Sequence, residues 1–202
     1  MAFIEKIEID AVKQAVRSPY LYITFAAFLS TLAFVDSYLS VYFLATLALI
    51  LSFILVIDIK HYIIPDSAQI SLFLLANILM YTMPEKSFVQ GYAGFAFAIF
   101  IFYGIYYLSD VVLNKEALGF GDVKLFANVG LILGFLSFNY FLWVLTITSG
   151  LFLIFRLLSK KKNKLIPYGP FIVVSLWICL LYSDTFKLFH NNMMDSIVNY
   201  IS

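Results

Sequence analysis

The sequence has a single cysteine, two histidines and few charged side chains. Only 12% of its 202 residues are Asp, Glu, Lys or Arg, and the formal net charge is +1. Because Cys179 is alone, the chain has no disulfide framework of its own and no zinc ribbon built from Cys-x-x-Cys pairs. A charge this close to zero also argues against nucleic acid as a partner.

Apolar residues, in contrast, are abundant. Hydrophobic residues make up 63% of the chain and aromatic residues 19%, and the mean hydropathy is +0.95. A water-soluble fold does not have enough interior to bury such a share of apolar side chains. The lipid bilayer is therefore the expected surroundings, and the predicted fold class is an all-α, polytopic integral membrane protein.

Seven segments read as transmembrane helices, each of which needs roughly 20 mostly apolar residues or fewer when anchors flank it. They cover residues 20–35, 39–57, 68–83, 88–109, 123–136, 140–158 and 171–183. The third, fifth and seventh are short and lie beside Gly or Pro. This predicts helices that begin around a polar cavity, where irregular backbone finds partners in protein or water.

The positive charges orient these segments. If the amino terminus is cytoplasmic, eleven of the thirteen Lys and Arg residues lie inside, and Lys86 and Lys187 lie outside. The basic run at residues 160–164 is then a cytoplasmic loop. His61 and His190 fall on opposite sides of the membrane in this topology, so we expect no metal site.

The predicted organisation is one membrane domain with two amphipathic ends. Residues 1–19 repeat apolar side chains at helical spacing and predict a helix on the membrane surface. Residues 20–183 form the membrane domain, without internal repeats or a polar linker. Residues 184–202 predict an amphipathic tail outside, and the sequence indicates no oligomeric state.

Two aspartates stand at the margins of apolar segments. Asp58 ends a nearly uninterrupted apolar stretch, and Asp122 opens the fifth segment after Gly119 and Gly121. An ionisable residue in such a place suggests a function. The charge-derived topology puts both carboxylates at the cytoplasmic end, although the aspartates were not used to derive it. The two glycines are expected to permit positive φ and a close backbone approach.

A pair of facing carboxylates can hydrolyse a peptide bond. Because the two charges repel, one group stays protonated while the other acts as a base. The ionised carboxylate takes a proton from water as the water attacks, and the protonated partner hydrogen-bonds the carbonyl oxygen. The sequence therefore predicts an aspartyl peptidase with Asp58 and Asp122 as its catalytic pair.

Taken singly, the acidic residues have simpler interpretations. Asp58 could be an interfacial anchor or an ion-pair partner of Lys60. Asp122 could be the N-cap of a helix that begins at Val123, and Asp66, after Pro65, fits an N-cap of the third segment.

Three motifs together resemble the type IV prepilin leader peptidases, which belong to the Gly-x-Gly-Asp class of intramembrane aspartyl proteases. The matching segments are Ile57-Asp58 with Ile64-Pro65-Asp66, Lys-Glu-Ala-Leu-Gly-Phe-Gly-Asp-Val-Lys-Leu at residues 115–125, and Ile166-Pro167-Tyr168-Gly169-Pro170-Phe171. Gly-x-Gly-Asp alone is a weak signal, but the three in this order are specific. The resemblance covers approximately residues 39–183.

The resemblance implies that Asp58 and Asp122 align with the catalytic aspartates of the family. It also implies a set of residues that shape the site: Gly119, Gly121, Pro65, Asp66, Lys124, Pro167, Gly169 and Pro170. The implied activity removes a short basic leader from prepilins or pseudopilins at the cytoplasmic face of the inner (plasma) membrane, without metal or other cofactor. Bifunctional members carry paired Cys-x-x-Cys motifs, so N-methyltransferase activity is not expected.

Two other functions fit parts of the pattern. One is another Gly-x-Gly-Asp membrane protease, related to signal peptide peptidases or presenilins, but these carry Tyr-Asp where this chain has Ile57-Asp58, and a Pro-Ala-Leu motif. The other is a non-enzymatic transporter or proton relay that uses intramembrane aspartates, for which deeper carboxylates and repeated halves are expected.

Overall fold

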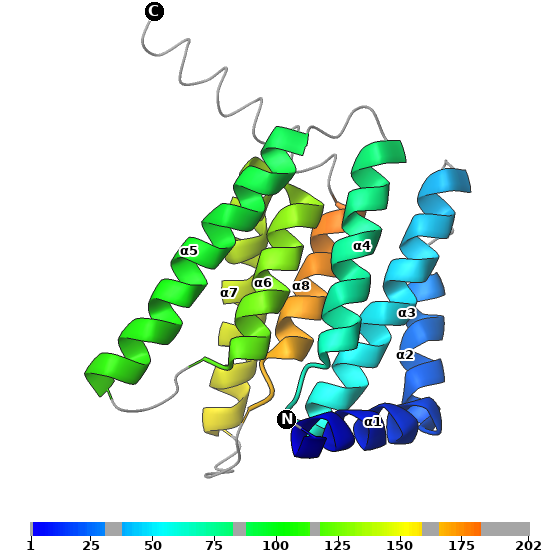
Figure 1. Cartoon of the computed structure of the whole chain (residues 1–202), viewed down its shortest axis with the longest axis vertical. Helices are drawn as coiled ribbons and strands as arrows, with labels where there is room; N and C mark the ends of the chain where they lie inside the picture. The colour runs from blue at the N-terminus through cyan, green and yellow to red at the C-terminus, as the bar shows by residue number, and fades with distance from the viewer. Residues whose placement is uncertain (1, 31–37, 83–87, 114–117, 159–165, 183–202) are drawn as a thin grey trace, which may run out of the picture.

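The computed structural model describes residues 2–30, 38–82, 88–113, 118–158 and 166–182, and within these ranges it contains helices and no strand (Figure 1). The helices are α1 (Ala2–Val16), α2 (Pro19–Ser30), α3 (Tyr38–His61), α4 (Asp66–Thr82), α5 (Phe88–Leu113), α6 (Phe120–Leu133), α7 (Phe135–Leu158) and α8 (Gly169–Leu181). The all-α prediction is confirmed. The predicted tail at 184–202 lies outside the described residues.

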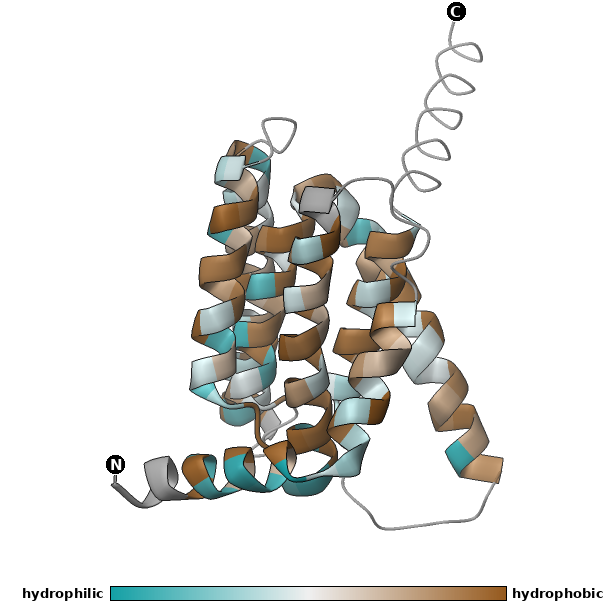
Figure 2. Cartoon of the chain, turned by 90° about the vertical axis from the view of Figure 1, so that its right-hand side faces the viewer, coloured by the Kyte–Doolittle hydropathy of each residue, from teal (hydrophilic) through white to brown (hydrophobic). Residues whose placement is uncertain are grey.

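Three of these helices contain stretches long and apolar enough to cross a membrane, namely Val41–His61, Phe88–Val112 and Phe135–Leu158. The helices α2 and α8 are shorter and also apolar. In Figure 2 the bundle helices are mainly apolar, whereas polar residues gather on α1. The molecule therefore has the composition of a membrane protein, and the count of seven spans stays a prediction.

The α1 helix lies across one end of the bundle (Figure 1). Its Ala11 and Ala15 are buried against Leu21, Val56 and Ile57 of α2 and α3. The alanines allow close packing because they have no side chain beyond Cβ. Part of the apolar stripe predicted for residues 1–19 is therefore used for packing on the bundle, and the role of this helix at a membrane surface stays a prediction.

The predicted boundary between the fifth and sixth segments is wrong. The sequence placed it at residues 137–139, where polar residues interrupt the apolar run, but α6 ends at Leu133 and α7 begins at Phe135. The single residue between them, Gly134, has φ +79°, a conformation that glycine adopts without steric cost. The turn occurs at Gly134 because its backbone can reverse the helix there, whereas Phe138 is needed inside α7 as a buried core residue.

The α6 helix is the centre of the bundle and packs against α4, α5, α7 and α8. Every residue from 125 to 132 is buried. Its Phe126 stacks on Phe102 of α5 with ring centroids 3.6 Å apart. In lipid the association of helices depends on such close packing rather than on removal of apolar surface from water.

Two glycines bring α5 and α6 into backbone contact. A Cβ atom at position 94 would lie within 2.4 Å of the Gly130 carbonyl oxygen, and a Cβ atom at position 130 would lie equally close to the Gly94 oxygen. Only glycine fits at this crossing, which is the use that membrane helices commonly make of small residues.

We expect Gly130→Ala to destabilise the fold, because the added methyl group must force α5 away from α6. Overpacking of this kind costs about 1–3 kcal/mol. Gly104→Ala on α5 is the matched control, since its Cβ would meet nothing within 4 Å. Thermal unfolding in detergent should show a lower midpoint for Gly130→Ala alone, and equal midpoints for the two variants would contradict the close crossing.

Candidate aspartate site

Asp58 is buried near the end of α3, with 5% of its surface exposed. Its Oδ2 accepts a hydrogen bond of 2.9 Å from the backbone N–H of Gly169, at the start of α8. A Cβ atom at position 169 would lie 2.7 Å from the same oxygen, so only glycine admits this approach. The helix continues past Asp58 to His61, where Tyr62 at φ 56° ends it in the left-handed conformation common after helices.

The simpler interpretations of Asp58 are wrong. An interfacial anchor needs an exposed carboxylate, and this one is buried. An ion pair with Lys60 is not formed, because the Lys60 ammonium donates a hydrogen bond of 2.8 Å to Ser18 Oγ and lies 5.7 Å from the centroid of the Tyr20 ring. Neighbours in sequence point to different sides of a helix, so Asp58 faces α8 and Lys60 faces the α1–α2 turn.

Asp122 lies in the first turn of α6, where the sequence had suggested an N-cap. The cap position is occupied by Gly119, and the helix begins at Phe120. The Asp122 N–H donates to the Gly119 carbonyl at 3.0 Å, and the Asp122 carboxylate lies beside the Gly119 main chain. A negative charge in the first turn is favoured by the helix dipole. The N-cap interpretation of Asp122 is therefore wrong.

The glycines before Asp122 do not adopt the positive φ that was expected from the sequence. Gly119 has φ −70° and ψ 143°, an ordinary extended conformation, and among the described glycines positive φ occurs at Gly134. What glycine provides at 119 is space, because a Cβ there would lie 3.1 Å from Asp122 Oδ2. At Gly121 a Cβ would be in ordinary contact with Ile64, 3.4 Å away.

The two aspartates come together at one end of the bundle. The end of α3 and the start of α6 lie at the same end in Figure 1, and the charge of Asp58 acts on Asp122. Each of α3 and α6 packs against both α4 and α8. Two carboxylates that are 64 residues apart in the sequence are thereby placed close enough to repel each other, and such a pair favours retention of a proton.

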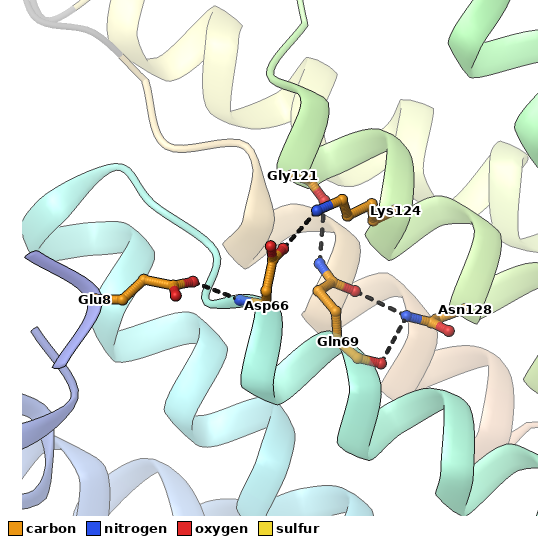
Figure 3. Close-up of polar contacts among 6 residues, drawn as sticks. All are labelled: Glu8, Asp66, Gln69, Gly121, Lys124 and Asn128. Carbon is orange, nitrogen blue, oxygen red and sulfur yellow. Dashed lines mark hydrogen bonds and ion pairs between the residues drawn. The ribbon is translucent and has the colours of Figure 1, made fainter. Parts of the chain in front are cut away.

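Asp66 and Lys124 join α4 to α6 beside this pair. The Lys124 ammonium pairs with an Asp66 carboxylate oxygen, and both side chains are partly or largely exposed, so the bridge itself stabilises little (Figure 3). Asp66 is the first residue of α4, after buried Pro65, rather than its N-cap. The Asp66 N–H is instead capped by Glu8 Oε1 of α1, at 2.6 Å.

The third motif forms the start of α8. Pro167 and Tyr168 precede the helix, and Pro170 lies in its first turn, where a missing N–H costs nothing. Burial raises the pKa of the Tyr168 phenol, the Ser149 side chain of α7 lowers it in part, and the charge of Asp122 raises it further. Tyr168 is therefore a neutral hydroxyl group beside Asp122.

Several residues of this region were not singled out from the sequence. They are Glu8, Gln69, Asn128, Ser149 and Tyr168. Gln69 and Asn128 are buried amides within apolar helices, a pattern visible in the sequence. The pairing of Tyr168 with Ser149, and of Glu8 with Asp66, joins distant segments and has no local signal.

A cavity of about 430 Å³ opens between α4, α5 and α6 next to Lys124. Its lining is mainly apolar and consists of Gln69, Ile70, Phe73, Phe95, Ile99, Tyr103, Phe120, Val123, Lys124, Ala127 and Asn128. Among the residues that the structure describes, no group of three or more His, Cys, Asp and Glu side chains is arranged to hold a metal ion.

Residues 43–159, more than half of the sequence, match the model of the type IV leader peptidase family. The chain belongs to this family. The match includes Asp58, Asp66, Asp122 and Lys124 and ends before the Tyr168 segment.

Curated relatives carry prepilin-processing names. A prepilin leader peptidase/N-methyltransferase of Aeromonas salmonicida is 30% identical over 68% of this chain and 50% of its own length. One of Legionella pneumophila is 30% identical over 64% and 46%, and a type 4 prepilin-like proteins leader peptide-processing enzyme of Escherichia coli is 32% identical over 57% and 42%. The chain thus spans about half the length of these relatives. No solved structure matches it.

We expect Gly169→Ala to destabilise the protein by displacing the Asp58 carboxylate. Loss of a hydrogen bond to a buried acid costs about 1.5–3 kcal/mol, in addition to the clash. In an Asp58→Ala background the same substitution should cost much less, because the clashing oxygen is gone and the nearest remaining contact is Cβ at 3.4 Å. Thermal unfolding of the four proteins of this double-mutant cycle measures the coupling.

Gly150→Ala on α7 is the control for this cycle, since its Cβ would meet nothing within 4 Å. Its effect should be the same in both backgrounds. An equal cost of Gly169→Ala with and without the Asp58 carboxylate would contradict the assigned contact.

Proposed function

We propose that this protein is a membrane aspartyl endopeptidase that removes the leader from type IV prepilins or pseudopilins, with Asp58 and Asp122 as its catalytic pair. Membership of the type IV leader peptidase family supports the reaction, and relatives bear the name prepilin leader peptidase. The observation that carries the assignment of the pair is the meeting of a buried carboxylate of α3 with that of α6 at one end of the bundle.

The reaction uses the pair as one unit that holds a single proton. The ionised carboxylate takes a proton from water while the oxygen of that water attacks the scissile carbonyl carbon. The protonated carboxyl group hydrogen-bonds the carbonyl oxygen and later gives its proton to the departing amine. Because the two groups titrate together, the proton belongs to the pair rather than to one residue.

Two glycines border this pair. Asp58 Oδ2 is held by the Gly169 N–H, and the Asp122 carboxylate lies beside Gly119. A backbone donor has a fixed direction, so Asp58 keeps one oxygen engaged while the other remains able to bind water or substrate. No metal is needed for this chemistry, since the two carboxyl groups supply both the base and the acid.

We further propose that the site faces the cytoplasm. The Lys and Arg residues of the described ranges are Lys6, Lys13, Arg17, Lys60, Lys124 and Arg156. They stand on α1, in the turn after it, or at the ends of α3, α6 and α7 that lie together with the aspartates (Figure 1). Because positive residues favour the cytoplasmic side of a membrane, this clustering supports a cytoplasmic cut.

The proposal predicts that Asp58→Ala and Asp122→Ala each abolish leader removal. The expected loss is at least roughly a thousandfold, because members of a catalytic unit do not replace one another. Each variant is coexpressed with a candidate prepilin, and leader removal is followed by the change in prepilin mass. Membrane insertion is checked by the yield of folded protein in detergent.

Asp110→Ala is the matched control, since Asp110 is an exposed acidic residue on α5. It should process the prepilin at the rate of the unaltered protein. Retained cleavage by Asp122→Ala would remove the pair from the mechanism.

A further inference from the structure

Two buried amide side chains connect α4 to α6 directly below the segment that carries Asp122. Gln69 and Asn128 are each 4% exposed within otherwise apolar helices. Asn128 Nδ2 donates to Gln69 Oε1 at 2.8 Å and to the Gln69 backbone oxygen at 3.1 Å. Gln69 Nε2 in turn donates to the carbonyl oxygen of Gly121 at 3.1 Å (Figure 3).

The order of these bonds gives the Gln69 amide a defined direction. Asn128 presents its NH₂ group, which can only donate, so the Gln69 group that faces it must be the oxygen. The Gln69 NH₂ group is then directed toward Gly121. The reverse orientation would set NH₂ against NH₂ at Asn128 and oxygen against oxygen at Gly121. Asn128 and the Gly121 carbonyl thus require the same direction of the Gln69 amide.

The acceptor at the end of this chain is the peptide group that leads into Asp122. The Gly121 carbonyl carbon is bonded to the Asp122 nitrogen. A hydrogen bond to the Gly121 oxygen therefore restrains the peptide plane that ends at the Asp122 Cα atom, to which the Asp122 side chain is attached. The neighbouring Lys124–Asp66 bridge also links α4 to α6, but it is partly exposed and therefore weaker. Hydrogen bonds in a dry interior are stronger and more directional than bonds in water.

This restraint matters because of how the two aspartate-bearing helices are arranged. Both α3 and α6 pack on α4 and on α8. On the α8 side, Gly169 holds Asp58 directly. On the α4 side, Gln69 holds the backbone beside Asp122. Buried polar contacts from both bridging helices thus reach the segments that carry the two carboxylates.

We propose that Gln69 and Asn128 are positioning residues that set the distance between Asp122 and Asp58. The inference rests on the proposed function of the aspartate pair and adds to it two residues that do not touch the reacting atoms. Their effect is transmitted through the Gly121 peptide group. Gln69→Leu and Asn128→Leu, which keep the approximate volume and remove the amide, are the direct tests.

The expected result is a loss in kcat of roughly 10- to 100-fold, with little change in KM, because a displacement of about 1 Å in a catalytic group has effects of this size. The double variant should be no worse than the more damaging single variant, since both residues act through one contact. The pH profile should also change. When the carboxylates move apart, the charge of one raises the pKa of the other less, so the alkaline limb of the profile shifts to lower pH.

Asn77→Leu is the matched control for a lost amide on α4. Asn77 donates to the Phe73 carbonyl and accepts from the Tyr92 hydroxyl at 2.6 Å, away from the aspartates. It should reduce thermal stability while kcat and the alkaline limb stay at the values of the unaltered protein. Equal effects of Asn77→Leu and Gln69→Leu on kcat and pH profile would overturn the proposal.

Asn128→Ala provides a smaller substitution if the leucine variants do not fold. It removes the donor to Gln69 Oε1, so the Gln69 amide is no longer held in the direction of the Gly121 carbonyl. We expect it to reproduce the loss in kcat, and a normal kcat in folded Asn128→Ala would overturn the proposal. Asp122→Ala is assayed alongside: cleavage by that variant would refute the catalytic pair itself, a result distinct from failure of the positioning role.

Discussion

The repulsion between a buried carboxylate, Asp58, and a half-buried one, Asp122, is the constraint on which the polar end of this molecule depends. Like charges in a poorly polarisable interior separate unless the backbone holds them, and the cost of holding them grows as water is excluded. Here the main chain supplies part of the restraint, because the Gly169 N–H donates to Asp58. A Cβ atom at position 169 would lie 2.7 Å from the Asp58 carboxylate, and one at position 119 would lie 3.1 Å from the Asp122 carboxylate. Glycine therefore leaves space for a carboxylate at both positions, with the tighter fit at 169.

The rest of the bundle makes those two contacts possible. The central helix α6 is held against α5 by the Gly94–Gly130 crossing and by stacking of Phe102 on Phe126. The same Phe126 lies against the Tyr168 ring, with centroids 6.2 Å apart, which joins the core to the segment that leads into Gly169. Packed rings therefore connect the apolar interior to the segment before Gly169, and a shift of α6 in the core would displace that segment.

Features that depend on the local sequence could be predicted, whereas contacts between residues far apart in the sequence could not. Long apolar runs predict helices locally, and this prediction is confirmed; an acid at the margin of such a run is conspicuous, so Asp58 and Asp122 could be proposed as a pair from the sequence. Which atoms hold an aspartate is a long-range property: Gly169 and Asp58 are separated by 111 residues. The turn at Gly134 was missed because apolar residues continue on both sides, and the expected Asp66 cap was replaced by Glu8 from a different helix.

The polar end of the bundle must satisfy two requirements that favour opposite environments. The proposed catalysis needs carboxylates shielded from water so that their mutual repulsion retains a proton, whereas the proposed topology needs exposed cations near the membrane surface. The structure separates the two kinds of group on nearby residues: Asp58 is buried while Lys60 turns toward Ser18, and Asp122 is half-buried while Lys124 pairs with Asp66. Helical periodicity alone produces this separation, because residues two apart lie on different faces. The two lysines therefore lie near the aspartates in the sequence while their ammonium groups contact Ser18 and Asp66 instead.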